Sequence, residues 1–453
     1  MKKRDDIEEL DEEIIDDEIV DEDEVIDDEI EELDDKPAKV ASKRPNRAQK
    51  PVKKAGMNKK TKIAIISSSA AVGVVAIALV VLLVILPLAG INIFKKKSAL
   101  YYDETASYGL YFYGNNHNKL AADDSTTVDM KRASTSLSTS YYDPSKPTVI
   151  WFHGWENDAP GSPNDRYLMA GNDTRIEFPG YDCSYVVEMK AKGYNVATFQ
   201  FQNVKEGDKN YAKDLALIFK YAVEDFNDTG YSLAYMFASE VVTIFGESYA
   251  KDITFVGHSC GGFVCTTTNY ILQYMYNNGV FTNKHLIASR MMLADPYVNT
   301  LGDTMPTKVM GTDETLGDRS KCDFVQDMIC SLHENSNVAI DVYFGMSGAS
   351  KSFVKNAEKL AKVQQHCVLV DMTSVKKSLS NSFRAHVVTR DWVLASITAD
   401  KLEDQNGDLA PSGACTNEEI LGMIGNIYEQ QYKGFNLALD SMKKVSDTSG
   451  FKW

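Results

Sequence analysis

Acidic residues are absent from Pro37 to Lys97, which holds 13 Lys and Arg, and no charged residue of either sign occurs from Ile63 to Phe94. Residues 1–36 show the opposite bias, with 21 Asp and Glu against four Lys and Arg. The net charge of −16 is therefore an average over unlike parts, because residues 98–453 carry 43 acidic and 31 basic residues. This mildly acidic part lacks the excess of basic residues that nucleic-acid binding requires, so we expect no nucleic-acid partner for it.

The uncharged run Ile63–Phe94 is long enough to cross a bilayer as a helix, since about 20 apolar residues are sufficient. A buried core helix would rarely lack charge on every side and lie between lysine clusters. A cleavable signal peptide is disfavoured because the run is too long and starts only at residue 63. We therefore expect residues 63–94 to form one transmembrane helix.

The flanks of this run predict its orientation. Eleven Lys and Arg lie from Lys36 to Lys62, but only three follow the run, at residues 95–97. The positive-inside tendency then predicts a cytoplasmic N-terminus and a single-pass protein of the cell membrane. Residues 98–453 are expected to be the extracellular domain.

The acidic tail, residues 1–36, is predicted to be disordered because its like charges repel and its hydrophobicity is low. Its Ile26, Ile30 and Leu33 have helical spacing, so folding onto a basic cytoplasmic partner is the alternative. The linker 37–62, rich in Lys, Pro and Ala, is expected to lie against anionic lipid headgroups.

Strand-like and helix-like stretches alternate in residues 98–453, which predicts an α/β domain with a mostly parallel sheet and crossover helices on both faces. Five apolar runs are predicted strands: Thr148–Phe152, Asn195–Gln200, Ile253–Val256, Met291–Ala294 and Val338–Phe344. Four helices are predicted between them: Ser184–Lys192, Asp214–Phe226, Tyr231–Tyr249 and a helix from Ser259 to about Asn277. No internal repeat is present.

The strand Ile253–Val256 runs into a G-x-S-x-G pattern formed by Gly257, Ser259 and Gly261. A nucleophilic serine on a sharp strand-to-helix turn needs tiny residues two positions before and after it, so that the strand and helix can approach closely. The pattern alone is weak, and a structural turn is the alternative. The preceding strand and the following apolar helix favour a nucleophile.

A second turn follows the strand Thr148–Phe152 at once, with the sequence His153-Gly154-Trp155. An oxyanion intermediate needs two backbone donors directed at the developing charge. The N–H groups of Trp155 and Cys260 are the natural pair. His153 is expected to hold the loop by packing.

A serine hydroxyl needs an imidazole to accept its proton and an acid to orient that imidazole. Among the seven histidines, His386 follows the last candidate strand, where a loop would reach the serine; its rivals are His333 and His366. His258 adjoins the serine and is expected to point elsewhere.

Two aspartates compete for the role of the acid. Asp295 directly follows the strand Met291–Ala294, at the sheet edge beside the predicted nucleophile. Asp371 ends a later strand, in the sequence VLVDM. We favour Asp295 and keep Asp371 as the alternative.

Four segments together resemble the α/β-hydrolase fold, and within it the lipase family of pancreatic and lipoprotein lipases. They are HGW at His153–Trp155, GHSCG at Gly257–Gly261, LADPY at Leu293–Tyr297 and RAHVVTRDWVLASI at Arg384–Ile397. The resemblance implies a Ser259, Asp295, His386 triad that forms an acyl-enzyme. It covers the catalytic domain only, because the family's C-terminal lipid-binding β-sandwich has no counterpart after His386, where the residues look helical.

The long connection from Pro296 to Asn337 is a candidate lid or pocket wall. The family closes its lid with a disulfide, and the spacing of Cys322 and Cys330 permits one without requiring it. Cys260 and Cys265, beside the serine, are expected to be buried thiols.

These observations predict a membrane-anchored serine hydrolase that cleaves carboxylic, lipid-type esters, a lipase or an esterase. We expect neither a metal nor a cofactor, and an ester or lipid as the substrate. The alternative is a surface binding protein built on a hydrolase fold whose chemistry has lapsed.

Overall fold

The computed structural model describes residues 100–104, 106, 108–117, 129–155, 175–178, 181–201, 211–226, 228–298, 321–345, 354, 357–373, 382–398, 401, 403, 407–429 and 443–444. The predicted acidic tail, basic linker and transmembrane helix therefore lie outside the described residues. Within the described part, no helix has the length and the apolar character that crossing a bilayer requires.

The core of the domain is a sheet formed by nine strands of the described part, in the order β11-β10-β9-β8-β7-β3-β6-β1-β2. In chain order the strands are β1 (Gly109–Tyr113), β2 (Met130–Arg132), β3 (Thr148–Phe152), β6 (Asn195–Gln200), β7 (Ile253–His258), β8 (Arg290–Ala294), β9 (Ala339–Phe344), β10 (Val368–Asp371) and β11 (Ile427–Glu429). Every residue of β3, β6, β8 and β9 is buried, as expected of strands covered on both faces.

Neighbouring strands from β11 to β6 are parallel, and β1 and β2 complete one edge of the sheet in antiparallel pairing. The chain moves outward from β3 to β6 and then returns to place β7 on the other side of β3. The carboxyl ends of β3 and β7 therefore meet at a point where the strand order reverses. In open parallel sheets this is the usual position of a binding crevice.

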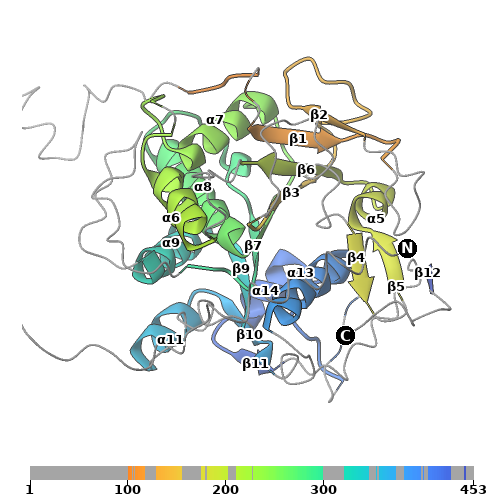
Figure 1. Cartoon of the computed structure of the whole chain (residues 1–453), viewed down its shortest axis with the longest axis vertical. Helices are drawn as coiled ribbons and strands as arrows, with labels where there is room; N and C mark the ends of the chain where they lie inside the picture. The colour runs from red at the N-terminus through yellow and green to blue at the C-terminus, as the bar shows by residue number, and fades with distance from the viewer. Residues whose placement is uncertain are drawn as a thin grey trace, which may run out of the picture. The chain divides into compact units, whose positions relative to one another are not determined.

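Helices cover both faces of this sheet (Figure 1). One face carries α6 (Tyr211–Val223), α7 (Leu233–Phe245), α8 (Cys260–Asn277) and α9 (Lys321–Ser336). The other carries α5 (Tyr185–Ala191), α13 (Ser382–Thr398) and α14 (Asn417–Met423). The short elements α11 (Ala357–Gln364), which packs against α9, and η3 (Lys284–Leu286), which packs against α7, complete the helices of the described part.

A second, small antiparallel sheet has the order β12-β5-β4. Its strands are β4 (Arg175–Phe178), β5 (Tyr181–Ser184) and β12 (Lys443–Lys444). The four-residue strand β5 leads directly into α5. This sheet was not predicted from the sequence.

The predicted mostly parallel sheet with helices is confirmed, and all five predicted strands are present with ends that differ by at most two residues. One local prediction, the position of His386, is wrong. His386 lies within the helix α13 and not on a loop. The connection from Pro296 to Asn337 contains α9, whose apolar residues at helical spacing bury one face; the buried residues include Phe324, Val325, Met328, Ile329 and Leu332. The part of the predicted lid at 299–320 lies outside the described residues.

The prediction for the residues after His386 is only partly right. The helix α14 follows α13, but β11 then adds a parallel strand beside β10 and β12 joins the small sheet. β11 spans three residues with no buried position, so it carries little of the apolar pattern by which a strand is recognised.

A buried ion pair joins the middle of the large sheet to the chain before α14. The Arg290 guanidinium contacts the Asp341 carboxylate at 2.8 and 3.1 Å, and it also donates to the carbonyls of Ser412 and Cys415. Tyr343 donates a further hydrogen bond to Asp341 at 2.6 Å. These bonds satisfy charges that would otherwise be costly to bury.

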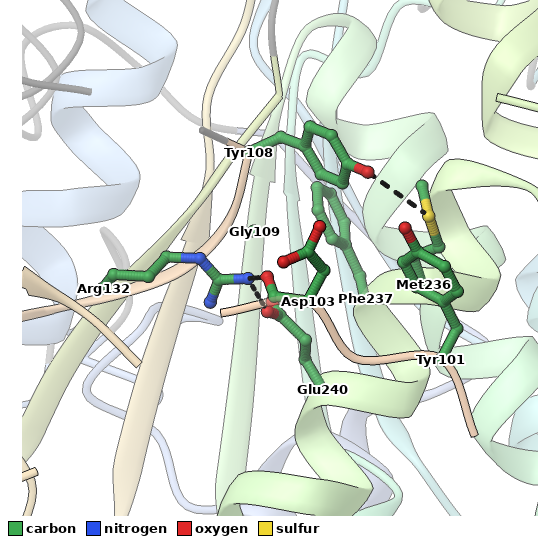
Figure 2. A pocket seen from close by; sticks show the side chains of 8 residues that line it. All are labelled: Tyr101, Asp103, Tyr108, Gly109, Arg132, Met236, Phe237 and Glu240. Carbon is green, nitrogen blue, oxygen red and sulfur yellow. Dashed lines mark hydrogen bonds and ion pairs between the residues drawn. The ribbon is translucent and has the colours of Figure 1, made fainter. Parts of the chain in front are cut away.

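A second ion pair lies at the β2 edge of the sheet. Figure 2 shows Arg132 of β2 directed at Glu240 of α7, in a small pocket that is also lined by Asp103 and Tyr108. Glu240 accepts a further hydrogen bond from the backbone N–H of Leu110, at 2.6 Å. Burial raises the pKa of Glu240 to about 7, and the positive charge of Arg132 partly opposes this effect.

Candidate active site

Ser259 lies at the turn between β7 and α8, with φ 53° and ψ −130°. A positive φ is uncommon for a residue with a side chain and costs about 1–3 kcal/mol where the surrounding structure enforces it. Ser259 is buried, and its backbone N–H donates to Ala294 on the neighbouring strand β8. The strained turn fits a serine held at the carboxyl edge of the sheet.

Glycine is required at positions 257 and 261, on either side of Ser259, because other backbone segments lie too close to leave room for a side chain. A Cβ at Gly261 would lie 2.2 Å from the His153 carbonyl oxygen and 2.4 Å from that of Phe152. A Cβ at Gly257 would lie 2.8 Å from the Gly262 Cα. The close packing of strand and helix that the G-x-S-x-G pattern predicts is therefore present at both glycines.

Asp295 and His386 meet beside this turn. Asp295 directly follows β8, is fully buried, and has a positive φ of 42°. Its Oδ2 lies 2.5 Å from Nδ1 of His386, on α13. Because β8 is the neighbour of β7, the pair is carried by elements next to Ser259. The structure thus brings together the favoured acid and the favoured base.

The rival residues have other partners. Asp371 accepts a hydrogen bond from the backbone N–H of Thr373, at 2.8 Å. The rings of His333 and His366 contact each other, with centroids 5.7 Å apart, and His366 faces Glu334 at 3.5 Å. Within the described part of the chain, none of these three residues contacts Asp295 or Ser259.

The loop after β3 packs against the serine turn. A Cβ at Gly154 would lie 3.2 Å from the Cβ of Ser259 and 2.9 Å from Nδ1 of His258. His153 Nε2 accepts from the Phe201 N–H at 3.3 Å, which leaves its Nδ1–H to donate to the Gly154 carbonyl at 2.7 Å. The His153 ring also stacks on Phe201. His153 therefore has the loop-holding position expected of it.

The two candidate oxyanion donors lie on either side of this contact. Cys260 is the first residue of α8, where the helix dipole favours negative charge. Trp155 follows Gly154 in the loop. Cys260 therefore adjoins Ser259 in the chain, and Trp155 adjoins Gly154, the residue that packs on Ser259.

The expectation that His258 points away from the site is wrong. Its ring lies 4.4 Å from that of His386, centroid to centroid. Side chains alternate along a strand, so His258 shares with Val256 the face of β7 that α13 covers. The period-two pattern of β7 was available in the sequence, but the position of His386 on that face was not.

Among the side chains that the structure describes, six cysteines are free thiols: Cys260, Cys265, Cys322, Cys330, Cys367 and Cys415. Cys260 and Cys265 are buried, as predicted. Cys322 and Cys330 both lie on α9 and form no disulfide with each other. Among the described residues, no group of three or more His, Cys, Asp or Glu side chains is arranged to hold a metal ion.

Comparison with known proteins gives weak likenesses only. No family model and no curated protein matches the chain. Among solved structures, a candidate hydrolase from Agrobacterium vitis S4 is 14% identical, with a TM-score of 0.26, over 55% of this chain and 88% of that one. Esterase B from Lactobacillus Rhamnosis (HN001) is 15% identical, with a TM-score of 0.22, over 68% and 81% of the two chains. Likeness at this level identifies neither a family nor a substrate for this chain.

Proposed function

We propose that the protein is a serine hydrolase of the α/β-hydrolase fold that cleaves carboxylic esters through an acyl-enzyme. The observation that carries the proposal is the pairing of Asp295 with His386 beside a serine on a strained strand-to-helix turn. Each residue in isolation has a structural explanation. Together they are the three groups that nucleophilic catalysis by serine requires, and they come from three separate parts of the chain.

In the proposed reaction, the Ser259 hydroxyl attacks the ester carbonyl carbon while His386 Nε2 takes its proton. Asp295 holds Nδ1–H and so fixes the tautomer in which Nε2 is the free acceptor. Collapse of the intermediate breaks the bond to the alcohol, which leaves with the proton from His386. Water then attacks the acyl-enzyme by the same route and releases the carboxylic acid.

The negative charge of each tetrahedral intermediate is met by backbone N–H groups of Trp155 and Cys260 in this proposal. Support comes from the packing of the His153-Gly154-Trp155 loop on the serine turn and from the position of Cys260 at the start of the 18-residue helix α8. Donors held by the fold in advance stabilise the transition state more than mobile ones do. No metal or cofactor is needed for this chemistry.

For the substrate we propose a lipid-type ester, which makes the protein a lipase or an esterase. The reason is the uncharged run at residues 63–94, which as a transmembrane helix would hold the catalytic domain beside a bilayer. The lysine-rich flank before it favours a single-pass protein with a cytoplasmic N-terminus and an extracellular domain. A basic cytoplasmic partner for the acidic tail belongs to the same proposal.

A binding protein with a lapsed active site is the second candidate. Among the described residues, the Ser259 hydroxyl makes no hydrogen bond to His386. In many serine hydrolases this bond is present before the substrate binds. Such bonds are frequently long or misaligned before substrate binds, so we favour the hydrolase.

The decisive experiment treats the full-length protein, in mild detergent, with a fluorophosphonate probe that reacts with activated serines. We expect wild-type protein to be labelled and Ser259→Ala to be unlabelled. Ser239→Ala is the control, because Ser239 is equally buried but bonds to the Tyr235 carbonyl on α7. Wild-type protein that resists labelling would favour the binding protein, and labelling that survives in Ser259→Ala would exclude this serine.

If the wild-type protein reacts with the probe, its acyl preference is measured with p-nitrophenyl esters of increasing chain length. A lipid-type substrate predicts that the rate peaks at long acyl chains. A peak at acetate or butyrate would leave the hydrolase in place but contradict the lipid substrate.

A further inference from the structure

His258 lies between the sheet and α13, at the end of β7. Its Cα pairs with Ala294 of β8, the residue just before Asp295. Its side chain lies on the α13 face of the sheet with Val256, which packs in the same apolar cluster as Trp392 of α13. The His258 imidazole therefore lies next to the turn that carries Ser259, between the sheet and the helix that carries His386.

Three rings lie in succession at this point. Trp151 of β3 is nearly parallel to His258, with an interplanar angle of 11° and centroids 6.3 Å apart. His258 in turn lies 4.4 Å from His386, with the rings tilted by 37°. The backbone of Gly154 closes a further side, because a Cβ there would lie 2.9 Å from His258 Nδ1. The His258 ring is thus held by the core and is itself in contact with His386.

His258 is kept neutral by its surroundings. Its side chain is buried, and its Nε2 has no hydrogen-bond partner among the described residues. Burial lowers the pKa of His258 well below 6.5, and His386, Arg390 and His153, which face it from α13 and from the loop after β3, lower it further. No carboxylate is among the groups that act on it, and only the backbone of His386 favours a positive charge at this ring.

We propose that His258 is a positioning residue for His386: its fixed ring supports the His386 imidazole from one side while Asp295 holds Nδ1, so that Nε2 faces Ser259. This inference rests on the proposed function, since it assigns His386 the role of the base. His386 extends from a helix, and one hydrogen bond at Nδ1 alone leaves the ring free to rotate about that bond. Contact with the His258 ring removes this freedom.

The lack of charge on His258 also matters for the proposed positioning role. His386 becomes an imidazolium when it takes the serine proton, and a second positive ring at 4.4 Å would oppose that step. An uncharged ring gives contact without repulsion. Phenylalanine has a similar flat shape and should replace much of this support, whereas alanine should not.

The test compares His258→Ala and His258→Phe with wild type in the full-length, detergent-solubilised protein. The rate of fluorophosphonate labelling should fall by about 10²-fold in His258→Ala, the scale associated with a 1 Å misplacement of a catalytic group. His258→Phe should recover most of that rate. With p-nitrophenyl acetate, kcat should fall while KM stays the same, because the lost interaction acts in the transition state.

Val256→Ala is the matched control, since Val256 is fully buried on the same face of the same strand. It should lower the melting temperature but leave the labelling rate near that of wild type. An equal loss of labelling in Val256→Ala and His258→Ala would show that any cavity on this face has the same effect, and would overturn the positioning role.

A second readout does not depend on activity. In protein labelled with ¹⁵N-histidine, the Nδ1–H proton of His386 should give a downfield signal that is sharp in wild type and in His258→Phe. It should be broad or lost in His258→Ala. If this change occurs but wild-type protein is not labelled by the probe, the positioning holds and the hydrolase proposal fails. If wild type is labelled and both the rate and the signal survive in His258→Ala, the positioning fails alone.

The pH profile of labelling gives the last check. We expect a single fall in labelling on the acid side, the same in wild type and in His258→Phe. A second protonation that disappears in His258→Phe would mean that His258 becomes charged in the working range, and would contradict a neutral supporting ring.

Discussion

The Oδ2 atom of Asp295 lies 2.5 Å from Nδ1 of His386, although 90 residues separate them in the chain. Asp295 reaches this position from the end of β8 and His386 from the first half of α13. The contact supports Asp295 as the acid in the proposed triad, because Asp371 instead accepts a hydrogen bond from the backbone of its own turn.

We expect Asp295→Asn to lower kcat for p-nitrophenyl esters by about 10⁴-fold, the loss seen when a triad acid becomes an amide and the histidine takes the wrong tautomer. Asp371→Asn is the matched change at the rival position and should stay close to wild type. Equal losses in the two variants, or a larger loss in Asp371→Asn, would reverse the assignment.

Glycine 261 gives a prediction about the turn itself. Gly261→Ala places a Cβ 2.2 Å from the His153 carbonyl oxygen, so the end of β3 and the loop after it must shift. We expect a loss of about 1–3 kcal/mol in unfolding free energy, typical of overpacking, together with a large drop in labelling by the fluorophosphonate probe.

The control for this change is Gly422→Ala, in the helix α14. A Cβ at Gly422 meets no atom within 4 Å, and alanine in a helix is favoured over glycine by about 1 kcal/mol. Gly422→Ala should therefore leave labelling unchanged and stability equal or higher. A Gly261→Ala protein with wild-type labelling would show that the loop after β3 does not have to hold this position.

The parts of the fold that could be predicted from the sequence are those that local pattern determines. Strands buried on both faces appear as short apolar runs, so β3 and β6 were predicted with their observed ends. α8 could be placed because Ser259 and the glycines mark its start. The edge strands β2 and β11 have partly exposed residues and span three positions each, too few for a periodic signal.

The residues of the candidate site also differ in how well the sequence alone predicts them. Ser259 and its glycines form a contiguous motif, and Asp295 follows a recognisable strand. His386 was chosen for its place in the order of the chain, but its location on a helix depends on how α13 packs against the sheet. The contact between His258 and His386 exists only in three dimensions, which is why the sequence led to the wrong expectation for His258.

The buried pair Arg290 and Asp341 gives a prediction about stability. Asp341→Asn leaves the guanidinium of Arg290 charged and almost fully buried, since the side chains of the pair are 3% and 0% exposed. Removing one partner of a buried pair costs about 3–5 kcal/mol, and we expect a loss of this size in urea unfolding.

The partly exposed pair of Lys359 and Asp323 is the control for this loss. Its side chains are 29% and 39% exposed, so Asp323→Asn should cost about 0–1 kcal/mol. The double variant Arg290→Met, Asp341→Leu should recover part of the stability, because it removes both charges together. A single Asp341→Asn variant as stable as wild type would mean that other groups compensate the Arg290 charge.

The pocket around Glu240 predicts how stability changes with pH. The pKa of Glu240 is about 7 in the folded protein, because of burial, and 4.5 is its ordinary value. A carboxyl whose pKa is raised by folding contributes stability that is fully present below about 4.5 and is lost as pH rises through 7. The unfolding free energy of wild type minus that of Glu240→Gln should therefore fall steadily as the pH rises from 4.5 to 7.

Glu419 provides an internal comparison of opposite sign. It is partly exposed, and hydrogen bonds from Lys401 and from the backbone of Thr416 lower its pKa to about 2. Its contribution should be present above 4.5 and decline as pH falls, so Glu419→Gln should affect only the acid side of the stability curve. The Glu240→Gln substitution could leave unchanged the slope of unfolding free energy against pH between pH 4.5 and 7. That result would show that the Arg132 charge outweighs burial and that Glu240 is ionised throughout this range.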